Sequence, residues 1–244
     1  MLQKRLNNQL NFEGQGTLRL DRLPWKRLFK IKITMDYNSQ LGQDRFINEF
    51  FDNKQNGFFV DIGAHEGITY SNTYFLEKYR DWKGICIEPL PVEFKELEKN
   101  RTAIKLNLCV SDFDGETDFT YVEGYANMLS GISEAYNNTH RERIRNEVNQ
   151  YGGKIHDIKV PVKKLQTIFD EFEVKEVDFC SIDTEGSEFN IVKSIDFEKT
   201  LVKIFIIENN YQESTIAEFL STKDYVLYTK LHWDDVFIKK EYIK

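Results

Sequence analysis

The stretch Phe58-Phe59-Val60-Asp61-Ile62-Gly63-Ala64-His65-Glu66-Gly67 joins a short apolar run to a turn bounded by glycines. The run at 58–63 predicts a buried strand, because short apolar runs of this kind are typical of parallel sheets. The turn has the pattern D-x-G-x-x-x-G, whereas the turn that cradles a pyrophosphate has G-x-G-x-x-G. A carboxylate here suits a cationic group and would repel a pyrophosphate. The stretch therefore predicts a ligand site beyond the carboxyl end of a parallel strand.

Strands and helices alternate along most of the remaining chain. Apolar runs predict strands at 84–89, 104–112, 177–183 and 203–209, and helical patterns cover 39–51, 71–79, 91–100 and a segment from about 186. This alternation implies βαβ crossovers and a parallel sheet. The last two strands, 225–230 and 236–240, are separated by only Leu231-His232-Trp233-Asp234-Asp235. That connection is too short for a crossover helix, so the two strands must pair antiparallel.

The interval from 113 to 176 interrupts this alternation. It contains a strand at 116–124, a polar stretch at 125–157, a strand at 158–162 and a helix at 163–172. A long polar segment inserted between two sheet strands is where a cap that binds the acceptor substrate would lie. We therefore predict an acceptor-side insert at about 121–160, with a mobile surface loop as the alternative.

Composition excludes several classes of protein. Apolar residues make up 41% of the 244 residues, and there are only 4 Pro and 13 Gly, so long disorder and collagen are excluded. No run approaches the ~20 apolar residues of a membrane-spanning helix. The N-terminal residues also lack the apolar segment that is typical of a secretory signal. The net charge of -7 argues against a general nucleic-acid binder. Cys86, Cys109 and Cys180 lie in apolar runs, which favours buried thiols in a reducing, cytoplasmic compartment.

The N-terminal segment 1–36 differs from the rest of the chain. Residues 1–34 hold eight Lys or Arg against two Asp or Glu, a net charge of +6, so the remaining residues carry -13. We read this segment as a basic arm that precedes a single domain at 37–244. A solvated arm is the simple interpretation, and the alternative is peripheral contact with an anionic membrane surface or a partner through 24–30.

Two further strand ends carry polar side chains. Glu88 ends the second strand, where a carboxylate can accept both hydroxyls of a ribose. Ser111 and Asp112 end the third strand, where the Asp112 carboxylate would accept a hydrogen bond from the exocyclic amine of an adenine. Asp112 also begins a good turn sequence, Asp-Phe-Asp-Gly, so a structural turn is the alternative.

The fourth parallel strand ends in a cluster of carboxylates. Asp183, Glu185 and Glu188 follow one another closely above an apolar sheet, which is costly unless they bind a cation or a ligand. The next strand ends in Glu208 and Asn209. Asp183, Glu208 and Asn209 are expected to converge, and their oxygens would suit Mg²⁺ or another divalent cation. Capping of the following helix by Asp183 or Glu185 is the alternative.

These motifs together resemble the FkbM family of S-adenosylmethionine-dependent methyltransferases. The similarity covers about 39–240 in the family's order and leaves out 1–36 and roughly 125–157. It rests on Ser39-Gln40, Gly42-Gln43-Asp44, Asp61 to Gly67, Ser71-Asn72-Thr73, Glu88-Pro89, Ser111-Asp112, Leu165, Val177-Asp178-Phe179, Ile182 to Glu188, and Asp234-Asp235-Val236-Phe237.

The resemblance implies a class I methyltransferase, Rossmann-like fold. This fold has a mostly parallel seven-stranded sheet with a C-terminal antiparallel hairpin and helices on both faces. The resemblance also implies S-adenosylmethionine as cofactor and a hydroxyl of a sugar or glycan as acceptor. The cofactor would be held at its methionine part by Asp61, Gly63, Ala64 and Gly67, at its carboxylate by Ser71 and Asn72, at the ribose by Glu88, and at the adenine by Ser111 and Asp112.

A sugar hydroxyl is a weak nucleophile at pH 7 and needs a base or a Lewis acid. We expect Asp183 to be the base and Glu185 the next candidate, and a histidine base would be His140 or His156. Two other functions remain open from the sequence. One is a non-catalytic interaction module on a methyltransferase fold, and the other is a nicotinamide-dependent oxidoreductase, which shares Glu88 but normally has G-x-G-x-x-G.

Overall fold

The protein is described by a computed structural model at residues 36–243, which lie in one compact unit. The predicted basic arm at 1–36 therefore falls outside the described residues except for its last position. Within 36–243, none of the helices has both the length and the apolar character needed to cross a bilayer.

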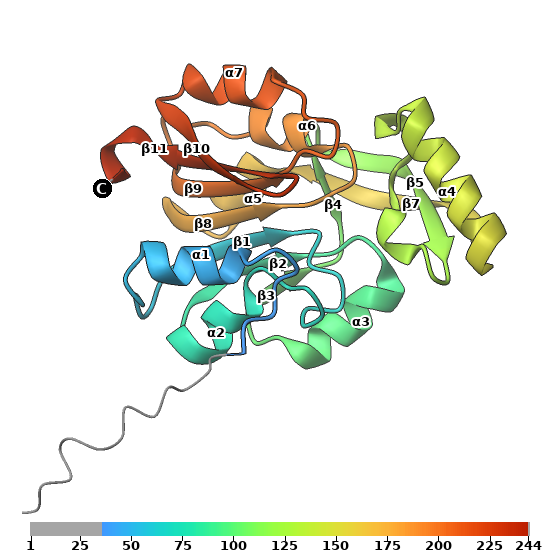
Figure 1. Ribbon diagram of the computed structural model, residues 1–244, viewed down its shortest axis with the longest axis horizontal. Coiled ribbons are helices and arrows are strands. Elements are labelled where there is room, and N and C mark those ends of the chain that lie inside the picture. The colour runs from blue at the N-terminus through green and yellow to red at the C-terminus, as the bar shows by residue number, and fades with distance from the viewer. Residues whose placement is uncertain (1–35, 244) are drawn as a thin grey trace, which may run out of the picture. The chain divides into compact units, whose positions relative to one another are not determined.

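A seven-stranded sheet forms the centre of this unit (Figure 1). Its neighbours β1–β2, β1–β8, β2–β3 and β8–β9 are parallel, whereas β11 runs antiparallel to both β9 and β10. The predicted α/β fold with a mostly parallel sheet is confirmed. In spatial order the strands are β10 (Tyr225–Leu231), β11 (Asp234–Lys239), β9 (Leu201–Glu208), β8 (Glu176–Ile182), β1 (Phe58–Ile62), β2 (Lys83–Ile87) and β3 (Ile104–Leu106).

Helices cover both faces of this sheet (Figure 1). One face packs on α1 (Gln43–Phe50), α2 (Tyr74–Arg80) and α3 (Pro91–Asn100), and the other on α5 (Leu165–Glu171), α6 (Glu188–Lys193) and α7 (Thr215–Ser221). Successive strand residues point to opposite faces, so Phe59 and Phe179 join the first core and Val60 and Cys180 join the second. The three cysteines are unpaired and buried.

A second, four-stranded sheet departs from the prediction. The predicted strand at 104–112 is two strands: β3 belongs to the central sheet, and β4 (Cys109–Ser111) begins the second one. Between them, the Asn107 side chain donates to the carbonyl oxygens of Glu88 and Pro89 at 2.8 and 3.0 Å. This anchors the chain where it changes sheet. The second sheet has the order β4, β7 (Lys154–Lys164), β5 (Gly115–Glu123) and β6 (Gly131–Ile132).

The polar stretch at 125–157 also contains regular structure. It holds the short 3-10 turns η3 (Asn127–Leu129) and η4 (Ser133–Ala135) and then α4 (Asn138–Tyr151). The Asn137 side chain caps this helix by accepting a hydrogen bond from the backbone of His140, and Gly152 ends it with φ +80°. Of its 14 residues only His140 and Ile144 are buried, so the sequence lacks the apolar period that identifies a helix.

Candidate active site

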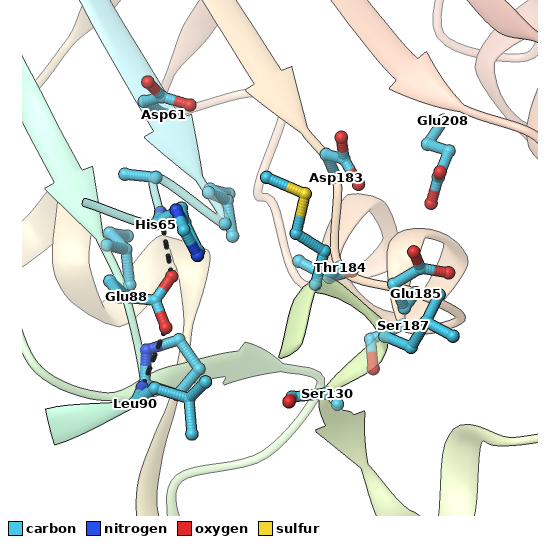
Figure 2. A pocket seen from close by; sticks show the side chains of 18 of the residues that line it. Asp61, His65, Glu88, Leu90, Ser130, Asp183, Thr184, Glu185, Ser187 and Glu208 are labelled. Atoms are coloured by element: carbon cyan, nitrogen blue, oxygen red, sulfur yellow. Dashed lines mark hydrogen bonds between the residues drawn. The ribbon is translucent and has the colours of Figure 1, made fainter. Parts of the chain in front are cut away.

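A cavity of about 280 Å³ opens at the carboxyl ends of β1, β2, β8 and β9, between these strand ends and part of the second sheet (Figure 2). In parallel sheets this edge is where ligands bind. The cavity brings together most of the predicted site residues. Those that line it are Asp61, Gly63, Ala64, Ser71, Asn72, Glu88, Asp183, Glu185 and Glu208, whereas Gly67, Ser111, Asp112 and Asn209 do not.

Gly63 makes the turn that opens the cavity. Its φ is +86°, and its backbone N–H and that of Ala64 both donate to the Ile87 carbonyl oxygen at 3.0 Å. A Cβ at this position would lie 1.8 Å from the carbonyl oxygen of Asp183. Only glycine therefore lets the end of β1 approach the end of β8 this closely.

Asp61 lies at the base of this turn and is 4% exposed. It accepts a hydrogen bond from the Thr73 hydroxyl, and its Oδ2 lies 3.9 Å from Nη1 of Arg101. Loss of solvation raises the pKa of Asp61, and the Arg101 charge opposes that rise. Asp61 is thus a buried carboxyl that lines the cavity and is held in place by Thr73 and Arg101.

Arg101 is the functional residue that sequence reasoning missed most clearly. Its fully buried side chain donates to Glu77 at 2.8 Å, to Thr73 Oγ1 at 2.9 Å and to the Gly67 carbonyl oxygen at 3.2 Å. A Cβ on Gly67 would lie 2.6 Å from Cδ1 of Leu97 and 2.7 Å from Cγ of Arg101, so glycine here makes room for these two side chains. A single arginine just after a helix normally indicates a solvated end, and nothing in the local pattern distinguishes it.

Glu88 lies opposite Asp61 in the cavity wall. Its two carboxyl oxygens accept one backbone hydrogen bond each, from His65 at 2.9 Å and from Leu90 at 2.8 Å (Figure 2). Loss of solvation raises the pKa of Glu88 to about 7 despite these two bonds. Each oxygen keeps a further lone pair for a ligand.

Ser71 and Asn72 precede α2, which begins at Tyr74 and not at 71 as predicted. The Ser71 hydroxyl accepts from the backbone N–H of Tyr74, the first residue of α2, at 3.1 Å. Asn72 donates to Ser181 Oγ at 2.9 Å, and its Oδ1 is buried without a partner. His65 Nδ1 is likewise buried without a hydrogen-bond partner. Buried polar atoms of this kind normally have a partner, so their position on residues lining the cavity fits a polar ligand.

Ser111 and Asp112 lie at the edge of the cavity wall and not in it. Ser111 ends β4 in the second sheet and is buried, and Asp112 pairs with Lys193 of α6 at 3.2 Å. The wall nearby is apolar. It consists of Pro89, Leu90, Leu108, Cys109, Val110, Phe119 and Ile132.

Three carboxyl groups meet at the other end of the cavity. Figure 2 shows Asp183, Glu185 and Glu208 on the same side. Asp183 is accessible from the cavity, and loss of solvation raises its pKa to about 7 and that of Glu185 to about 8. Arg143 of α4 partly opposes the rise at Glu185.

His140 lies behind Glu185 and not in this cavity. Its Nε2 lies 3.1 Å from the Leu129 carbonyl oxygen, which can only accept, so Nε2 carries a proton. Nδ1 lies 3.5 Å from Glu185, and burial lowers the pKa of His140. His156 lies in β7 and contacts Glu123 at 3.1 Å, outside the cavity lining. Neither histidine is placed to act directly on a molecule in this cavity.

The predicted metal ligands do not all converge. Asp183 and Glu208 do, but Asn209 donates to Asp235 at 2.7 Å and to the Glu213 carbonyl oxygen at 2.9 Å. Throughout 36–243, no group of three or more His, Cys, Asp or Glu side chains is arranged to hold a metal ion. Glu188, the third acid after β8, accepts from the backbone of Thr184 and Gly186 and so stabilises the turn.

Comparisons with known proteins agree with this geometry. Residues 61–234 match the family described as the methyltransferase FkbM domain. Methyltransferase sdnD of Sordaria araneosa is 24% identical over 212 residues, which cover 77% of this chain and 79% of that protein. The crystal structure of methyltransferase FkbM from Methylobacillus flagellatus KT is 12% identical with a TM-score of 0.44, and the match covers 75% of this chain but only 43% of that one. Because the family match extends over more than half of the chain, the protein belongs to the FkbM methyltransferase family.

Proposed function

We propose that the protein is an S-adenosylmethionine-dependent O-methyltransferase that methylates a hydroxyl of a sugar or glycan. One observation carries the proposal: a single cavity has the glycine turn and Glu88 at one end and the carboxyl cluster at the other. The strand order of the central sheet, with β11 inserted antiparallel between β9 and β10, supports the class I methyltransferase fold that the sequence predicted.

The residues at the β1–β2 end fit the cofactor. Glu88 has free lone pairs for the ribose hydroxyls, and the apolar wall around Leu90 and Val110 suits a planar base. The amide oxygen of Asn72 lacks a partner and suits an ammonium group better than the carboxylate predicted from the sequence. When bound, the cofactor supplies a methyl group on a positively charged sulfur, which suits a cavity lined by carboxyl groups.

The residues at the β8–β9 end fit the removal of a proton. In its ionised form Asp183 accepts the proton of the acceptor hydroxyl at a carboxylate oxygen. Asn127 to Ile132, from the insert, close the cavity from above and exclude water. Correct alignment of the two reactants alone contributes roughly 7–11 kcal/mol in favourable cases. No step of this mechanism is assigned to a metal ion, because one of the three predicted ligands, Asn209, is bound to Asp235 instead.

The cofactor assignment is tested by calorimetric titration. Glu88→Ala is expected to weaken S-adenosylmethionine binding by about 2–3 kcal/mol, because two charge-assisted hydrogen bonds to the ribose are lost. Glu98→Ala, an exposed change on α3, serves as the matched control and should bind like the original chain. Equal affinity in both variants would remove Glu88 from the site.

The same titration separates the alternatives. An oxidoreductase would bind NAD, whose pyrophosphate the carboxyl groups of this cavity repel. A non-catalytic module would bind the cofactor but transfer no label to any member of a glycan panel. Neither alternative explains why three carboxyl groups gather at the far end of the cavity.

Methyl transfer is expected to accelerate as the pH rises from about 6 to 8. Asp183 and Glu185 have pKa values of about 7 and about 8, so both hold protons at the lower pH and cannot act as a base. Stability should change in the opposite direction. A carboxyl whose pKa is raised by folding binds more protons in the folded chain, so its contribution is present at low pH and is lost as the pH rises through its folded pKa.

Both effects are measured as kcat/KM and Tm across this pH range. Asp183→Asn should remove much of the decrease in Tm, because asparagine does not titrate. A rate that does not change with pH would contradict the carboxylate base.

A further inference from the structure

A second cavity, of about 220 Å³, adjoins the first on the side of β8 and β9. The two cavities share Glu185, Glu208 and Asn210 in their walls. Glu185 and Glu208 lie on the same side of the first cavity as Asp183, at which the proposed mechanism places the acceptor hydroxyl. The remaining wall comes from the insert, around Tyr136 and His140, and from the segment that leads into α7, around Tyr211 and Glu213.

The lining has the composition of a site for hydroxyl-bearing rings. Carboxyl and carboxamide groups form hydrogen bonds with vicinal hydroxyls, and the exposed ring of Tyr211 suits the C–H side of a sugar. Among the residues described as lining this cavity, none is Lys or Arg. The charge of this wall therefore comes from glutamates.

Some of these groups are available to a ligand and others are not. Glu188 and Asn209 are engaged with neighbouring groups of the protein. Glu213 and Tyr211 are exposed, and the hydrogen bonds of Glu213 are made by its backbone. Glu185 contacts His140 at 3.5 Å and is influenced by the charge of Arg143. The side chain of Glu213 is therefore the carboxyl group of this lining that is most open to a ligand.

We infer that this second cavity binds the part of the acceptor away from the reacting hydroxyl, and that the acceptor is a polyhydroxylated ring without negative charge, either neutral or bearing an amine. This inference rests on the proposed function, which it makes more specific. A carboxylate or phosphate on the acceptor would lie beside the exposed side chain of Glu213, and no Lys or Arg lines this cavity to balance that charge, so the like-charge contact is unfavourable. An ammonium group would be attracted to the same wall.

Three probes that share one ring test the inference: methyl glucoside, methyl glucosaminide and methyl glucuronide. Binding to the full chain is followed by saturation-transfer NMR, which needs no turnover. The neutral and amine probes should bind, and the glucuronide should bind at least about tenfold more weakly. Glu213→Lys should reverse this order by strengthening the glucuronide and weakening the glucosaminide. Glu198→Lys makes the same charge change at an exposed position just before β9, at the opposite end of that strand from the cavities, and should preserve the order.

Two results would overturn the inference: equal binding of all three probes, or the same probe order in Glu213→Lys as in Glu198→Lys. Titration with S-adenosylmethionine separates this failure from failure of the proposed function. If the chain binds the cofactor but does not discriminate among the probes, only the acceptor inference fails. If it does not bind the cofactor, the proposed function fails.

Discussion

Asp183→Asn is expected to slow methyl transfer by about 10²- to 10⁴-fold, the usual contribution of a positioned general base. Asparagine has nearly the same shape as aspartate, so the cavity should keep its form. It cannot accept the proton of a hydroxyl. The affinity for S-adenosylmethionine, measured by calorimetry, should change little, because the cofactor residues lie at the β1–β2 end of the cavity.

The control for this variant is Asp170→Asn, an exposed change on α5 that is distant from the lining of either cavity. It should keep the original rate. If Asp183→Asn also keeps the original rate, Asp183 is not the base, and Glu185 becomes the next residue to change. Single-turnover measurements that follow the methylated product separate the rate of the chemical step from the rate of product release.

Gly63→Ala is expected to lower the free energy of unfolding by roughly 2–5 kcal/mol and to abolish cofactor binding. The positive φ costs a non-glycine residue about 1–2 kcal/mol, and forced overpacking adds about 1–3 kcal/mol. The added methyl group would lie 1.8 Å from the backbone of Asp183, so β1 and β8 must separate where they support the cavity. Urea denaturation and calorimetry measure the two effects.

Gly42→Ala isolates the contribution of the steric clash. Gly42 has the same φ of +86°, but no atom lies within 4 Å of the position its Cβ would occupy. It should therefore show the conformational cost alone and leave cofactor binding intact. Equal destabilisation by the two variants would show that the contact with Asp183 is not the reason for glycine at position 63.

The carboxyl ends of the parallel strands were the most predictable part of the site. Apolar runs identify β1, β2, β8 and β9, and the polar residues that follow them must gather at one edge because the strands are parallel. This reasoning predicted that Asp61, Glu88 and Asp183 lie near one another, and all three line the cavity. It did not apply to Asp112, because the chain changes sheet at Asn107 and β4 belongs to another set of strands.

Residues that act through long-range contacts were not predictable. Arg101 becomes buried only when α3, β1 and the turn at Gly67 come together, and no local pattern records that meeting. Leu129 and Arg143 line the cavity from a stretch with few apolar residues, where the helical period is too weak to recognise. The side chains that face the acceptor thus come from the part of the sequence with the least pattern.

The pairing of β4 with β7 has a consequence for how this protein diversifies. Ser111 pairs with Lys164, so the chain leaves the cofactor half and returns to it at neighbouring strands, about 4.8 Å apart. The residues between these points form α4 and most of the second sheet, and they contact the donor half at a few positions, such as Asn127 with Glu93 at 2.9 Å. Such an arrangement lets evolution, or a protein engineer, graft a different acceptor-facing module onto an unchanged methyl-donor half. We expect chimeras joined at Asp112 and Lys163 to keep the donor affinity of this chain and to take their acceptor preference from the transplanted segment.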